Sequence, residues 1–129
     1  MRVLDDSYNA NADSMLAALQ ALCDLPCKGR RVAVLGDMAE LGATSIEAHA
    51  EVGRRAAELR IDQLFAVGKM AGELGGAARK AGLLRVTEIG EVEGAAAAVK
   101  EYLQPGDVVL LKASRSTRLE RVGEALRKG

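Results

Sequence analysis

Short runs of β-branched and aliphatic residues alternate five times with longer segments in which apolar residues recur at helical spacing. The strand-like runs are residues 2–5, 31–35, 63–67, 84–89 and 108–111. This alternation is typical of α/β domains, in which each helix returns the chain to the start of the next parallel strand. We therefore predict a Rossmann-like, doubly wound domain, with a mainly parallel sheet of about five to six strands and helices on both faces. No linker or repeat interrupts the pattern, so residues 1–129 are predicted to form a single domain.

The expected helices carry capping patterns at their starts. Asn11 or Asp13 is expected to cap the first helix, and Thr44 with Glu47 has the spacing of a capping box ahead of the second. His49, the single histidine of the chain, falls on that second helix with no obvious acid or nucleophile partner at helical spacing other than in the neighbourhood of Glu51. This placement favours a packing or helix-surface role for His49 over a catalytic one.

The balance of charge excludes several classes of partner. Eighteen basic residues and eighteen acidic residues are interspersed, so the chain lacks the one-signed field expected of a nucleic-acid binder. The densest basic cluster, Lys28 with Arg30 and Arg31, is interpreted as the solvated lead-in to a strand. No apolar run approaches the roughly 20 residues that a membrane span needs. Cys23 and Cys27 are spaced CxxxC, which favours free thiols in a cytoplasmic protein over a metal or redox site.

The sequence lacks the complete motifs of common catalytic sites. It contains no GxxxxGK[ST] phosphate loop, no GxGxxG after the first strand and no GxSxG around a serine. In an open parallel sheet, ligands meet the loops at the carboxyl ends of the strands. The loops at those ends span residues 5–11, 36–42, 68–69 and 112–117, and three of the four are rich in polar side chains. The pattern indicates a domain that holds a ligand rather than one that transforms it alone.

Three segments carry a family resemblance. Residues 5–15 are DDSYNANADSM, residues 35–42 are LGDMAELG with an HxxVG pattern at 49–53, and residues 109–116 are VLLKASRS. Together they resemble the DDxYNANPxSM, LGDMxELG and VLVKGSRS motifs of the C-terminal domain of Mur ligases of the MurF type, over residues 3–126. The chain departs from this pattern at Ala12, where the family has proline, and at Ala113, where it has glycine. Alanine at position 113 would be strained if that position required a positive φ.

The resemblance implies a role in peptidoglycan synthesis, and so in cell-wall formation, cell shape and cell division. MurF-type ligases use ATP and Mg²⁺ in the cytoplasm to join D-alanyl-D-alanine to UDP-N-acetylmuramoyl-tripeptide. Their central ATPase domain and N-terminal UDP-substrate domain are absent from this chain, so we expect the chain alone to be inactive and assign it no catalytic or metal-binding residue. The implied nucleotide-binding residues are Asp6, Tyr8, Asn9 and Asn11. The implied residues of the D-alanyl-D-alanine side are Asp37, Met38, Lys112, Ser114 and Arg115.

Other interpretations of these residues stay open at this point. Asn11 and Asp13 have capping as an alternative role, and Asp37 has simple pairing with Lys112 across neighbouring strand ends. The chain as a whole has three alternatives: a domain of another Mur-type amino-acid ligase, a receiver-like phosphotransfer switch, or a binding or oligomerisation module without a nucleotide role. A receiver needs a phosphorylatable aspartate at the end of the third strand, where this chain has Ala66, Val67 and Gly68.

Overall fold

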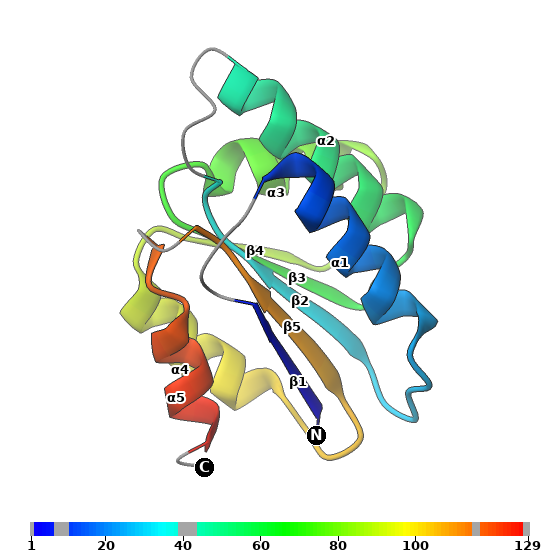
Figure 1. The fold of residues 1–129 in the computed structure, drawn as a ribbon, viewed down its shortest axis with the longest axis vertical. Helices are drawn as coiled ribbons and strands as arrows, with labels where there is room; N and C mark the ends of the chain where they lie inside the picture. Colours follow the sequence, from blue (N-terminus) through cyan, green and yellow to red (C-terminus); the bar gives the residue numbers. More distant parts are fainter. Residues whose placement is uncertain (1, 7–10, 39–43, 115–116, 128–129) are drawn as a thin grey trace.

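Five parallel strands form one sheet in the order β1-β5-β2-β3-β4 (Figure 1). The computed structural model describes residues 2–6, 11–38, 44–114 and 117–127. The strands are β1 (Arg2–Asp6), β2 (Arg31–Leu35), β3 (Gln63–Val67), β4 (Val86–Ile89) and β5 (Val108–Lys112). The predicted parallel sheet is therefore confirmed. The predicted fourth strand began too early, because Leu84 is 94% exposed and lies outside the sheet.

Helices cover both faces of the sheet, as predicted. They are α1 (Ala12–Asp24), α2 (Ser45–Glu58), α3 (Ala71–Lys80), α4 (Val92–Tyr102) and α5 (Glu120–Arg127). Buried residues of α1, α2 and α3 pack with one set of strand side chains, and those of α4 and α5 pack with the alternate set on the opposite face (Figure 1). Successive side chains of a strand point to opposite faces, so the continuous apolar runs seen in the sequence supply both cores. None of the helices in the described residues is long and apolar enough to cross a bilayer.

The two predicted helix caps have different outcomes. Asn11 caps α1: its side-chain oxygen accepts a hydrogen bond from the Ser14 N–H at 2.9 Å, and the Ser14 hydroxyl oxygen accepts one from the Asn11 N–H at 3.0 Å. The capping box predicted at Thr44 and Glu47 is wrong. Thr44 is the N-cap residue of α2, but its ψ of 0° differs from the extended backbone that aims a side chain at the first turn, and it makes no capping hydrogen bond.

Arg30 and Arg31 have structural roles at the amino ends of the strands, so interpreting them as merely solvated is wrong. The Arg31 guanidinium donates hydrogen bonds to the Leu22 and Leu25 carbonyls at 3.3 and 2.7 Å, where α1 ends. The Arg30 guanidinium lies 3.9 Å from the centroid of the Tyr102 ring and forms an ion pair with the buried Asp107 at 2.9 Å. Both arginines are half-buried, whereas Lys28 is exposed as expected.

Candidate functional site at the carboxyl ends of the strands

The strand register brings the predicted site segments to one edge of the sheet. Asp6 at the end of β1 is paired with Lys112 at the end of β5, and Lys112 is paired on its other side with Leu35 of β2. The chain leaves β1 and β2 toward α1 and α2 on one face, but it leaves β5 toward α5 on the opposite face. Such a reversal is a topological switch point, where open α/β sheets bind their ligands. Asp6 of the predicted nucleotide side therefore lies beside Lys112 of the predicted dipeptide side at this switch point.

The peptide unit between Asp37 and Met38 connects three elements around the end of β2. The Asp37 carbonyl accepts a hydrogen bond from the Ser114 N–H at 2.7 Å. On the same peptide, the Met38 N–H donates to His49 Nε2 on α2 at 3.0 Å. Residues 37–38 are thus held by Ser114 on one side and by α2 on the other.

The Asp37 carboxylate is held by the segment after β3. Its oxygens accept hydrogen bonds from the Lys69 N–H at 3.0 Å and the Met70 N–H at 2.8 Å, at the start of α3. The hydrogen bonds that position this carboxylate thus come from the backbone of residues 69–70. The alternative interpretation from the sequence was simple pairing of Asp37 with Lys112. Asp37 remains half-buried, and each carboxylate oxygen has a second lone pair available for a ligand.

Lys112, Ser114 and Met38 are nearly inaccessible, with exposures of 2%, 4% and 5%. Met38 packs its side chain into the core on the side of α1, α2 and α3, so only its backbone faces the strand ends. Ala113 is fully buried, and the only described non-glycine residues with a positive φ are Arg60 and Arg118. Alanine at position 113 therefore carries no such backbone strain. Its methyl group lies close to Gly36: a Cβ added to Gly36 would be only 2.7 Å from the Ala113 Cβ.

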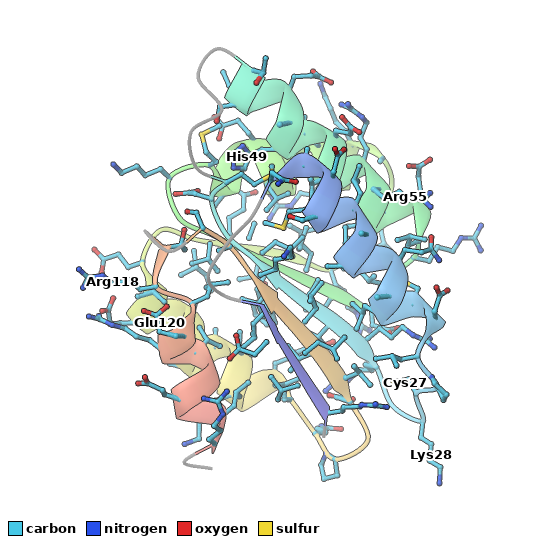
Figure 2. The ribbon with its side chains drawn as sticks, viewed as in Figure 1. Cys27, Lys28, His49, Arg55, Arg118 and Glu120 are labelled. Atoms are coloured by element: carbon cyan, nitrogen blue, oxygen red, sulfur yellow. The ribbon has the colours of Figure 1, made fainter. Side chains whose placement is uncertain are left out.

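A hollow of about 290 Å³ opens beside these groups, between the end of β3 and the starts of α4 and α5. We call it the α4–α5 hollow; its lining residues are Asp37, Val67–Lys69, Gly90–Glu93, Thr117, Arg118 and Arg121. Lys69, Arg118 and Arg121 contribute positive charge to this lining. Asp37, Glu91 and Glu93 contribute negative charge. The exposed Arg118 extends from the segment that precedes α5 (Figure 2).

Two features of the α4–α5 hollow suit an anionic group. The N-cap residue of α4, Glu91, makes no side-chain capping hydrogen bond, so N–H groups of the first helical turn are left for another acceptor. The Thr117 hydroxyl oxygen is buried and, in the part of the chain described, has no hydrogen-bond partner. A larger groove of about 490 Å³ lies between α2 and α3, lined in part by Ile46 and Gly72. That groove lies away from the strand ends, so we favour the smaller hollow as the ligand site.

The chain matches a known family over most of its length. Residues 1–115 match the family model described as Mur ligase, glutamate ligase domain. The chain belongs to this family.

Relatives of this Mur ligase domain are similar in both sequence and structure. It is 40% identical over 96% of its length to the UDP-N-acetylmuramoyl-tripeptide–D-alanyl-D-alanine ligase of Mycobacterium tuberculosis, and 37% identical over 95% to that of Bacillus subtilis. It spans only 28% and 27% of the length of these two relatives. Among solved structures it resembles MurF from Acinetobacter baumannii (TM-score 0.85) and the Thermotoga maritima MurF ligase in complex with ADP (TM-score 0.77). Each is 32% identical to the chain and covers 98% of it, and the chain covers 28% of each.

The positions of the remaining predicted site residues of the Mur ligase domain can now be stated. Tyr8, Asn9 and Arg115 lie outside the described residues. Asn11 lies at the start of α1, where the structure shows the capping role for its side-chain oxygen. Among the described residues, no group of three or more histidine, cysteine, aspartate or glutamate residues is arranged to hold a metal ion. Cys23 and Cys27 are free thiols, and burial raises the pKa of Cys23.

Several residues of the α4–α5 hollow were not predicted from the sequence. Thr117 is the last residue of the polar loop 112–117 and Arg118 directly follows it, but neither was assigned to the site. No sequence motif marked the start of α4 as part of the site. Its position near β5 and α5 follows from the strand order, in which the chain returns after β4 to place β5 between β1 and β2.

Proposed function

We propose that this domain is part of an ATP-dependent ligase that joins D-alanyl-D-alanine to UDP-N-acetylmuramoyl-tripeptide, and that it binds the dipeptide whose amine forms the new bond. The observation that carries the proposal is the convergence of Asp6, Asp37, Lys112 and Ser114 at one switch point of the sheet. The names of the relatives support the same substrates. We place the reaction in the cytoplasm because it consumes ATP.

The α4–α5 hollow suits a short zwitterionic peptide. A dipeptide has one carboxylate and one ammonium group, and the lining carries three side chains of each charge, of which Arg121 and Glu93 form an ion pair with each other. We place the carboxylate near the start of α4, where the helix dipole, Arg118 and the Thr117 hydroxyl favour a negative group. The ammonium then faces the half-buried Asp37, whose carboxylate oxygens can each accept a further hydrogen bond beside those from the Lys69 and Met70 N–H groups.

On the nucleotide side, we propose that Asp6 receives the ribose of ATP. A carboxylate is an acceptor-only group and can accept hydrogen bonds from two neighbouring hydroxyls. The end of β1, next to Lys112, is a suitable location for such a contact. The described residues offer Mg²⁺ no cluster of ligands, so we assign the metal and the phosphates to the central domain of the complete ligase.

In this scheme the domain orients the dipeptide amine and excludes water. By resemblance, the tripeptide carboxylate is activated as an acyl phosphate. The dipeptide ammonium first loses a proton, and the neutral amine nitrogen then attacks the acyl carbon and displaces phosphate, which takes up the second proton released from the nitrogen. The acyl phosphate is readily hydrolysed, so closure of this domain over the central domain protects it. The chain alone then has no ATPase or ligase activity.

Asp6→Ala is expected to weaken ATP binding selectively. In a complete ligase that carries this domain, the substitution should raise the KM for ATP about tenfold, the usual effect of losing a hydrogen bond to a charged group. The kcat at saturating ATP should change much less. Steady-state kinetics with varied ATP measures both values, and Asp13→Ala at the exposed first turn of α1 is the control. An unchanged KM for ATP would instead favour a module without a nucleotide role.

A further inference from the structure

His49 is buried and uses both of its ring nitrogens. Its side chain is 1% exposed, Nε2 lies 3.0 Å from the Met38 nitrogen, and Nδ1 lies 2.6 Å from the Ser45 carbonyl oxygen. The Met38 N–H is a donor, so Nε2 must be an acceptor, and the carbonyl oxygen is an acceptor, so Nδ1 must carry the hydrogen. The two contacts therefore select one neutral tautomer, with hydrogen on Nδ1.

The two hydrogen bonds of His49 reach residues on either side of the connection from β2 to α2. Met38 comes just after β2, and Ser45 is the first residue of α2, so a single imidazole binds the chain before and after residues 39–43. A histidine that only filled space in the core would not need hydrogen bonds to both flanks. His49 lies in the amino-terminal part of α2, and Figure 2 shows it above the carboxyl ends of the strands.

The Met38 N–H belongs to the same planar peptide unit as the Asp37 carbonyl. That carbonyl accepts a hydrogen bond from the Ser114 N–H at 2.7 Å. Rotation of the peptide would therefore break the bond to His49 and the bond to Ser114 together. It would also move the Asp37 side chain, whose carboxylate binds the backbone of residues 69–70.

We infer that His49 is a positioning residue, which fixes Asp37 and Ser114 through the Asp37–Met38 peptide. It touches no substrate itself. The structural part of this inference stands on the hydrogen bonds alone. Its consequence for ligand binding rests on the proposed function, in which Asp37 and Ser114 lie on the dipeptide side.

The first test reads the hydrogen bonds directly in the isotopically labelled chain. His49 is the single histidine, so its ring nitrogens give unambiguous NMR signals, which should show hydrogen on Nδ1 and an acceptor at Nε2. His49→Leu should speed hydrogen exchange of the Met38 amide about tenfold or more, relative to the Leu64 amide within the sheet. His49→Gln, which retains an acceptor, should restore part of that protection.

Val52→Ala is the matched control, because Val52 is fully buried on the same helix but forms no part of these contacts. It should lower overall stability without selectively exposing the Met38 amide or shifting the Asp37 and Ser114 signals. Equal effects of His49→Leu and Val52→Ala at these three residues would overturn the inference. A ring spectrum with hydrogen on Nε2 would overturn it as well.

The second test measures the affinity of the same chains for D-alanyl-D-alanine. His49→Leu should raise the dissociation constant about fivefold or more, and Val52→Ala should leave it within about twofold. If the unaltered chain does not bind the dipeptide, the proposed function fails for the dipeptide side. The positioning role is then still decided by the exchange and ring spectra, so the two failures are distinguishable.

Discussion

Gly68→Ala is expected to lower the free energy of unfolding by about 3–4 kcal/mol, combining backbone strain with a steric clash. Gly68 has a φ of +110°, which side-chain-bearing residues rarely adopt. A Cβ there would lie 2.7 Å from both oxygens of the Asp37 carboxylate. Asp37 must then move off the backbone of residues 69–70, so dipeptide binding should fall together with stability. Urea denaturation gives the first quantity, and calorimetric titration gives the second.

Gly82→Ala separates the strain from the clash. Gly82 has a similar φ of +107°, but a Cβ there would meet nothing within 4 Å. It should therefore cost only the conformational part, about 1–2 kcal/mol, and leave ligand binding unchanged. Equal losses of stability in the two variants would contradict the close approach of Asp37 to Gly68.

Asp107→Asn should produce the second large effect, a loss of about 2–4 kcal/mol at neutral pH. Asp107 is 2% exposed, and its carboxylate accepts hydrogen bonds from the Arg30 N–H at 2.8 Å and the Gln104 N–H at 2.9 Å. The Arg30 guanidinium adds an ion pair at 2.9 Å. An asparagine amide places donors against these donors and leaves the guanidinium without its counter-charge.

The effect of Asp107→Asn should depend on pH in a defined direction. Burial alone would raise the pKa of Asp107, but hydrogen bonds from the Arg30 side chain and from the Arg30 and Gln104 N–H groups outweigh burial and lower it. A carboxyl whose pKa is lower in the folded state adds stability above its unfolded pKa, about 4, and loses that contribution as pH falls through the folded value. The stability difference between the two proteins should thus be constant above about pH 5 and shrink below about pH 4.

Urea denaturation at a series of pH values checks this difference, with Asp62→Asn as the control. Asp62 accepts a comparable hydrogen bond from the Arg31 N–H at 2.7 Å, but it is exposed. Its replacement should cost less than about 1 kcal/mol. A stability difference for Asp107→Asn that grew as the pH fell would contradict the lowered pKa.

The fold was predictable because local signals agreed along the chain. Arg31–Leu35 and Gln63–Val67 are apolar along their length, as strands covered on both faces must be. Asn11 combined a capping side chain with a following helical stripe. The sequence misled at Thr44, where the side-chain pattern of a cap was present without the extended backbone that a cap requires. Leu84 misled for a similar reason, because an apolar side chain alone does not place a residue in a sheet.

The candidate site was predictable only in part. Motif resemblance indicated Asp37 and Lys112, and their strand-end positions follow from the sheet register. The partners of the Asp37 carboxylate were not predictable, since they are backbone N–H groups of residues 69–70, which carry no side-chain signature. The role of His49 was hidden for the same reason, because its partners are a backbone N–H and a backbone carbonyl.

The most direct test of the central proposal is an NMR titration of the labelled chain with D-alanyl-D-alanine and with its N-acetyl derivative. The free dipeptide should shift the amide signals of Asp37, Lys69, Thr117, Arg118 and Arg121, which line the α4–α5 hollow. The acetylated dipeptide, which lacks the ammonium group that Asp37 is proposed to receive, should shift them far less at equal concentration. Equal responses to both ligands, shifts centred on the groove between α2 and α3, or no response at millimolar dipeptide would contradict the proposal that this domain receives the dipeptide.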